Sequence, residues 1–277
     1  MVHIPNIHDS KWIFIAGSET RFVFDVVNAA NIVQQKQGNC VNNIYFFTDC
    51  SNAAAILSAN DLPCGQLFGL DALTRQIELF DDVSSIYCAV SSHGDIDGIE
   101  NKIKPNELIH KIENIKGLTD GFVLFGQCYS GIFNLTDQSK LCVLGASNFY
   151  PSISSSEASG GKWVANVFFY FFFEWFKNPV DVDGDKQHTI ADAYKWASYK
   201  TNNLLIELKI RDSKTFNEWC IQEQKNIELL KKNPIPANIM DCQVREAALN
   251  NRLNIYHNQQ EAWISNCDAA LRLIVKV

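Results

Sequence analysis

The feature that most constrains the fold is a set of short apolar runs, each of which ends in turn residues. The five runs cover residues 11–17, 43–49, 85–92, 121–127 and 141–147. They are continuous rather than alternating, and they are rich in β-branched and aromatic residues, which is typical of strands covered on both faces. Helix-like segments lie between them, among them 21–38 and 105–117. This alternation predicts an α/β fold in which helices cover both faces of a mostly parallel sheet of about six strands.

The character of the sequence changes near residue 200. Beyond this point, charged and helix-favouring segments surround the loop sequence "NPIPAN" at 233–238. We therefore expect one α/β domain over 1–200 and a C-terminal helical extension over 201–277.

Composition excludes several classes of protein. Hydrophobic residues make up 47% and charged residues 20% of the chain, as in ordinary folded proteins. The formal net charge of −7 gives no reason to expect a nucleic acid as partner. The longest apolar run, 163–176, is too short to span a bilayer and carries Asn166 and Glu174, so we expect no membrane partner.

The cysteines and the N-terminal residues indicate in which cellular compartment the protein is expected. The chain has nine cysteines and no CxxC pair, which argues against a zinc site. No basic leader precedes the first apolar run, so we expect a cytoplasmic protein with mostly free thiols, and the sequence leaves delivery into another cell open.

Two strand ends carry the residues of a nucleophilic site. His93 follows the run 85–92, and Cys128 follows the run 121–127. Consecutive parallel strands are usually neighbours, so we expect these two side chains to meet at one edge of the sheet. A thiolate can attack a carbonyl while a histidine carries the proton, and the backbone N–H groups of Gly94 and Cys128 can form an oxyanion hole.

The same residues carry a resemblance to a known group of enzymes. "SSHGD" (91–95) resembles the histidine motif of the caspase/legumain group of cysteine peptidases, and "GQCYSG" (126–131) resembles its nucleophile motif. Arg21 precedes Asp25-Val26 by four positions, which is similar to the first strand-to-helix junction of that group. The resemblance covers roughly residues 10–200.

The resemblance implies a three-layer α/β/α caspase-like sandwich and a cysteine endopeptidase that needs no cofactor and no metal. Cys128 would be the nucleophile, His93 the acid/base, and Arg21 part of the pocket for the substrate residue before the cut. The segment 144–172 resembles the group's substrate strand, with Ser147, Asn148 and Glu157 lining the cleft. The substrate would be a protein or peptide cut after Asp or Asn, and a basic preference stays open.

Two other functions remain open. "GQCYSG" approaches the nucleophile elbow of α/β-hydrolases, which would use His188 or His257 as the base. A non-catalytic caspase-like interaction module is the other alternative. Under each hypothesis the C-terminal helices can serve partner binding or self-association.

A separate motif lies at 181–192. Asp181, Asp183, Asp185, Thr189 and Asp192 occupy positions one, three, five, nine and twelve of a calcium-loop pattern, whose sixth position holds Lys186 instead of glycine. We favour an Asx-rich turn that caps the following helix, and calcium binding stays open.

Overall fold

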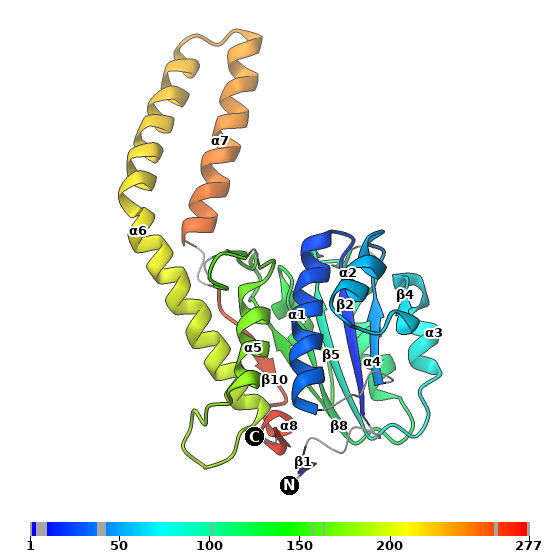
Figure 1. The fold of residues 1–277 in the computed structure, drawn as a ribbon. Coiled ribbons are helices and arrows are strands. Elements are labelled where there is room, and N and C mark those ends of the chain that lie inside the picture. Colours follow the sequence, from blue (N-terminus) through cyan, green and yellow to red (C-terminus); the bar gives the residue numbers. More distant parts are fainter. Residues whose placement is uncertain are drawn as a thin grey trace. The chain divides into compact units, whose positions relative to one another are not determined.

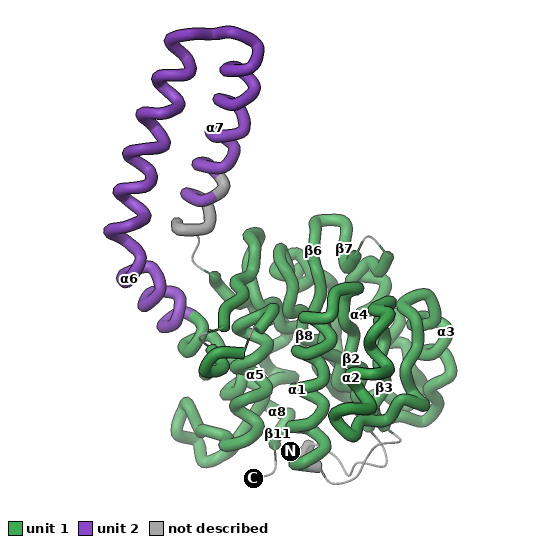
Figure 2. The backbone as a smooth tube through the Cα atoms, turned by 45° about the horizontal axis from the view of Figure 1, so that its top comes forward, with its two compact units in different colours: residues 1–201, 260–277 green, residues 202–259 purple. Residues whose placement is uncertain are grey.

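The structure is a computed structural model of the 277-residue chain. It describes residues 2–3, 10–37, 43–100, 102–156, 158–162, 164–257 and 260–275. The chain forms two compact units, one over 1–201 and 260–277 and the other over 202–259 (Figure 2).

A seven-stranded sheet forms the centre of the first unit (Figure 1). Its strands lie in the order β10-β9-β8-β5-β2-β3-β4, and every neighbouring pair is parallel except β10 and β9. The strands are β2 (Ser10–Ala16), β3 (Ile44–Phe47), β4 (Leu67–Phe68), β5 (Ser85–Ser91), β8 (Asp120–Phe125), β9 (Leu141–Gly145) and β10 (Trp263–Ser265).

All five apolar runs are strands of this sheet, so the predicted α/β class and mostly parallel sheet are confirmed. The sheet has seven strands rather than about six, because β4 and β10 add two short edge strands. Two small pairs lie outside it: β1 (Val2–His3) with β11 (Leu273–Ile274), and β6 (Gly94–Asp95) with β7 (Gly98–Ile99).

Helices pack on both faces because successive side chains of a strand point to opposite sides. In β2, Trp12 and Phe14 enter one apolar core, and Ile13 and Ile15 enter the other. The first core packs against α1 (Thr20–Gln37), α2 (Ala53–Ala59), α5 (Val167–Lys177), the start of α6 (Ile190–Lys232) and α8 (Cys267–Arg272). The second packs against α3 (Leu73–Glu78) and α4 (Pro105–Glu113).

The end of the chain departs from the expected division. Residues 201–277 were expected to form one helical extension, but residues 260–275 return to the first unit. There β10 pairs with β9 along Trp263–Gly145, Ile264–Leu144 and Ser265–Val143, and α8 and β11 follow. The helical extension is therefore limited to 202–259.

The second unit is a hairpin of two helices. It contains the later part of α6 and α7 (Pro236–His257). Its small core holds Ile227, Cys242 and Leu249, and Arg245 donates to Glu223 across the pair at 2.8 Å. Within the described ranges, no helix combines the length and apolar character needed to cross a bilayer.

Candidate active site at the ends of the central strands

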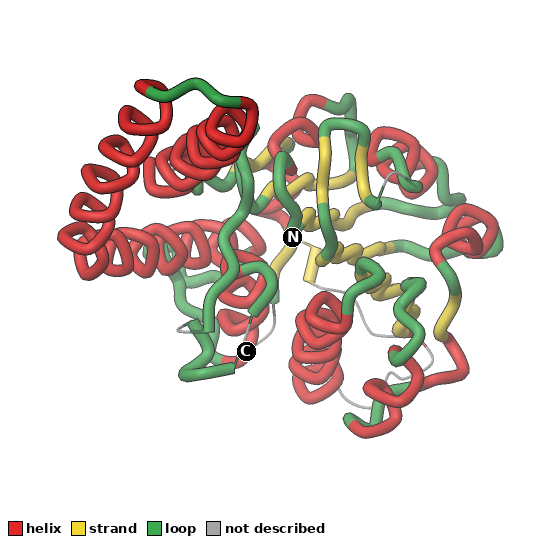
Figure 3. The backbone as a smooth tube through the Cα atoms, turned by 90° about the horizontal axis from the view of Figure 1, so that it is seen from above, coloured by secondary structure: helices red, strands yellow, loops and turns green. Residues whose placement is uncertain are grey.

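The candidate site lies where loops follow three neighbouring strands, β2, β5 and β8. The strand order reverses between β2 and β5, since β3 lies on the far side of β2. Open parallel sheets form binding crevices at such reversals, beyond the carboxyl ends of the strands. Figure 3 looks at the sheet from above the view of Figure 1. The strands lie between helices that cover the two faces of the sheet.

The loop of His93 touches the loop of Cys128, whereas the sequence predicted that the two side chains themselves would meet. β5 and β8 are parallel neighbours, and Gly94 lies against the backbone of Cys128 and the side chain of Gln127. A Cβ at position 94 would stand 2.3 Å from the Cys128 carbonyl oxygen and 2.5 Å from Gln127 Cγ. Only glycine allows so close an approach, which explains why position 94 of "SSHGD" is a glycine.

His93 bonds with two residues of the loop after β2 and the start of α1. Its Nε2 contacts the Glu19 carboxylate and lies 3.1 Å from Arg21 Nη2. The guanidinium can only donate, so the Arg21 contact suits an unprotonated Nε2, and the Glu19 contact suits a protonated one. The ring meets Phe22 edge-on at 4.9 Å, and about half of the side chain (55%) stays exposed. The imidazole is therefore supported on one side and open to solvent on the other.

Glu19 is the residue of this site that the sequence analysis missed. It precedes Arg21 by two positions, in the turn between β2 and α1. The hydrogen bond with His93, with a smaller contribution from Arg21, lowers the pKa of the Glu19 carboxyl below its ordinary value. One sequence signal could have identified Glu19. It is an acidic residue just after β2, the strand that neighbours the strand before His93.

Arg21 lies at the start of α1, close to His93. Its Nε is 2.7 Å from a Glu19 carboxylate oxygen, and its guanidinium lies 4.7 Å from the Phe22 ring. A third of its side chain is exposed (33%). An acidic or amide side chain of a substrate would have to share or replace the Glu19 contact to reach this guanidinium.

Cys128 is a partly buried free thiol just beyond β8. Its Sγ accepts a hydrogen bond from the Ser152 backbone N–H at 3.3 Å and lies 3.7 Å from the Ser152 hydroxyl. The imidazole of His93 and this thiol thus bond to different partners in this structure. Catalytic hydrogen bonds are often formed only when substrate binds, so the separate partners of the two side chains are compatible with a catalytic site and with a non-catalytic one.

The turn after Cys128 is strained and tightly held. Tyr129 has a φ of 58°, in the left-handed region that a bulky side chain rarely adopts. Its N–H donates to the Tyr150 carbonyl at 3.0 Å, and the Gly131 N–H donates to the Asn148 carbonyl at 3.2 Å. These two hydrogen bonds hold the turn against the segment that follows β9.

Ser147 has a different environment from the one expected. It is fully buried, and its hydroxyl donates to the Gln127 carbonyl at 3.2 Å and lies 3.2 Å from the Ser130 hydroxyl. In return, the Ser130 hydroxyl accepts the Ser147 N–H at 2.9 Å. The structure thus gives Ser147 a structural role beneath the Cys128 turn instead of the expected place in a substrate cleft. Asn148 is half-buried nearby, and Glu157 lies outside the described residues.

Asp25, the acidic residue of the motif that contains Arg21, is buried beneath the histidine loop. Its carboxylate accepts hydrogen bonds from the Ser91 hydroxyl at 2.8 Å, the Ala165 N–H at 3.1 Å and the Asn166 N–H at 3.0 Å. It joins α1 to the end of β5 and to the start of α5. Burial raises the pKa of Asp25 to about 7, against the opposing effect of these hydrogen bonds.

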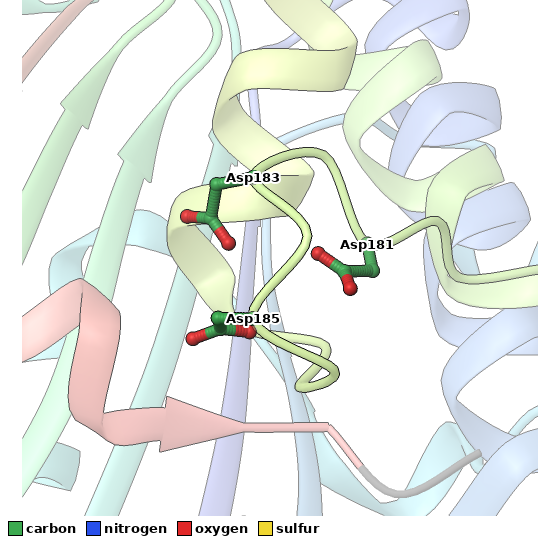
Figure 4. Close-up of side chains that lie close together, drawn as sticks. All are labelled: Asp181, Asp183 and Asp185. Atoms are coloured by element: carbon green, nitrogen blue, oxygen red, sulfur yellow. The ribbon is translucent and has the colours of Figure 1, made fainter.

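The acidic loop at 181–185 gathers three carboxylates. Carboxylate oxygens of Asp181, Asp183 and Asp185 lie within 4.8 Å of one another, and Figure 4 shows the three side chains around one turn. Asp181 accepts the Gly184 N–H, three residues further along the loop, at 2.6 Å, and Asp183 pairs with Lys195 at 2.7 Å.

The residues after this loop cap α6. Asp192 accepts the Thr189 N–H at 2.9 Å, and the Thr189 hydroxyl accepts the Asp192 N–H at 3.2 Å. These reciprocal bonds form a capping box, in agreement with the favoured interpretation of this motif as a helix-capping turn.

The structure places His188 far from the nucleophile. The His188 carbonyl accepts the Val275 N–H at 2.7 Å, and its neighbour Thr189 bridges to Ile274 of β11. Because β10 runs antiparallel to β9, the chain that continues into α8 and β11 leaves at the amino end of β9, whereas Cys128 lies beyond the carboxyl end of β8. The side chain of His257 lies outside the described residues.

No family model matches the chain, and no curated protein matches it.

Proposed function

We propose that this protein is a cysteine endopeptidase of the caspase/legumain type. The observation that carries the proposal is the contact between the two strand-end loops, in which Gly94, the residue after His93, packs on the Cys128 carbonyl. A nucleophile and an acid/base on neighbouring strands, at the reversal point of a parallel sheet, form a complete thiol hydrolase pair.

The chemistry follows from these positions. The Cys128 thiol gives its proton to His93, and the thiolate attacks the peptide carbonyl carbon. The backbone N–H groups of Gly94 and Cys128 stabilise the oxyanion. His93 then donates the proton to the leaving amine, and an acyl-thioester remains on Cys128. A water molecule, deprotonated by His93, hydrolyses this thioester and restores the free thiol.

Arg21 gives the proposal a substrate preference. Its guanidinium is near His93 and is partly exposed, so it suits a carboxylate or carboxamide next to the scissile bond. We propose a preference for Asp or Asn at this substrate position. A basic side chain there would instead approach Glu19.

Active-site probes test this proposal. Peptide acyloxymethyl ketones that bear Asp, Asn, Arg or Lys next to the warhead are incubated with wild type, Cys128→Ala, His93→Ala and Arg21→Ala. We expect labelling of Cys128 that needs His93 and favours the Asp or Asn probe, with that preference lost in Arg21→Ala. Labelling that survives His93→Ala would contradict the dyad, and a preference for Lys or Arg would reverse the assigned specificity.

A second candidate function is a non-catalytic interaction module. It is favoured by one observation, namely that His93 bonds to Glu19 and Arg21 while Cys128 bonds to Ser152. Equal failure of all four probes on folded wild-type protein would support this module over the peptidase.

Glu19 should contribute to turnover through the imidazole that it contacts. In Glu19→Gln, we expect kcat/KM for the preferred peptide to fall about 100-fold, because the neutral amide stabilises the protonated imidazole less well. The rate is measured between pH 5 and pH 9.

A matched variant separates this effect from general disturbance of the loop. Glu100→Gln removes a carboxylate that contacts Ser18 at 2.9 Å in the same loop but does not reach His93. Equal losses in the two variants would show that Glu19 acts only by holding the loop.

A further inference from the structure

The backbone that contacts the Cys128 sulfur is held by a side chain from the other end of the chain. Gln260 follows the helical hairpin and is almost fully buried, with 2% of its surface exposed. Its side-chain amide donates to the Ala146 carbonyl at 2.6 Å, and its amide oxygen accepts the Ile153 N–H at 2.8 Å. Both polar ends of the side chain are therefore used.

These two bonds connect the sheet to the segment over the sulfur. Ala146 extends β9 and donates its N–H to the Phe125 carbonyl of β8 at 2.9 Å, so it has a fixed position. Ile153 directly follows Ser152, whose N–H donates to Cys128 Sγ. Gln260 thus sets the distance between the end of β9 and the residue that bonds to the nucleophile.

We propose that Gln260 is a positioning residue of the Cys128 site, which holds the backbone of residues 152 and 153 against the sulfur. A substrate carbonyl has to approach this sulfur, so the position of Ser152 sets how accessible the nucleophile is. The part of this inference that concerns turnover rests on the proposed function. The part that concerns accessibility rests on the contacts alone.

The test is the rate at which iodoacetamide alkylates Cys128. Tryptic cleavage after Lys116 and Lys140 gives a peptide whose only cysteine is Cys128, so mass spectrometry follows this thiol separately from the others. In Gln260→Glu at pH 8, the carboxylate cannot donate to the Ala146 carbonyl. We expect alkylation about fivefold to tenfold faster than in wild type, the factor that one lost hydrogen bond is worth. Gln260→Met, which removes both polar ends, should behave in the same way.

Protonation provides a readout that a merely destabilised fold would not give. A protonated glutamic acid can donate to Ala146 and accept from Ile153 as glutamine does. The ratio of variant to wild-type rates should therefore return towards one as the pH falls, in Gln260→Glu but not in Gln260→Met. A ratio that stays constant with pH in Gln260→Glu would contradict the proposed pair of bonds.

A matched control uses another glutamine that contacts the returning chain. Gln138 donates to the Ser265 hydroxyl of β10 at 2.6 Å. If Gln138→Glu accelerates alkylation as much as Gln260→Glu, loosening of β10 explains the effect and the inference fails. Unchanged alkylation in both Gln260 variants would also overturn it.

The two proposals fail in different ways. Faster alkylation of the Gln260 variants without any peptide hydrolysis by wild type would refute the peptidase and keep the positioning role. Peptide hydrolysis by wild type, with alkylation and KM unchanged in the variants, would keep the peptidase and refute the positioning role.

Discussion

Replacing Cys128 with alanine should abolish peptide hydrolysis. The variant loses the sulfur of the loop that contacts the His93 loop, so no acyl-thioester can form at this position. We expect kcat/KM for the preferred peptide to fall at least about 10⁴-fold, as in other hydrolases that lose a nucleophile. The measurement is release of a fluorogenic group from a peptide with Asp or Asn before the cut.

His93→Ala should cause a loss of similar size, because the nucleophile and its acid/base act as a unit. Cys64→Ala and His110→Ala are the matched controls, since both residues are exposed and lie on other elements. These controls should keep wild-type rates. Residual activity within tenfold of wild type in Cys128→Ala would assign hydrolysis to another residue.

Asp25 should make the stability of the protein depend on pH. Burial raises the folded-state pKa of this carboxyl to about 7, whereas the ordinary pKa of an exposed aspartate is 3.8. The folded state therefore binds more protons than the unfolded state between these two values, and stability decreases as the pH rises through this range. The free energy of unfolding lost over this range is about 4 kcal/mol.

The comparison with Asp25→Asn isolates this contribution, because the amide does not titrate. The free energy of unfolding is measured by urea denaturation of both proteins between pH 4 and pH 8.5. Wild type should lose up to about 4 kcal/mol relative to the variant between pH 4 and pH 7.5, with little further change above pH 8. A difference that is independent of pH would mean that Asp25 keeps one protonation state throughout.

The central strands could be predicted because their signal is local. Each is a continuous apolar run bounded by turn residues, and the helices between them follow the apolar period of a helix. The edge strands gave no such signal. Leu67–Phe68 and Trp263–Ser265 are too short, and the latter follows a long helical segment, so its return to β9 depends on tertiary packing.

The candidate site could be predicted in part for the same reason. His93, Gly94 and Cys128 follow recognisable strands, and the parallel order brings their loops together. Glu19 lies in a short turn, where a carboxylate is common. Its role becomes visible only when the fold brings His93, from the neighbouring strand β5, into contact with it. Ser147 also follows a strand, but its burial beneath the Cys128 turn depends on its pairing with Ser130, which no spacing in the sequence indicates.

The return of β10 has a consequence for synthesis on the ribosome. The strand that covers the outer edge of β9 is made after the whole helical hairpin, about 120 residues later than β9 itself. Until then the nascent domain presents an open strand edge, which is a template for pairing with other chains. Chains that stop within the hairpin would keep that edge open, so the edge of β9 is exposed to pairing for as long as the hairpin is being made.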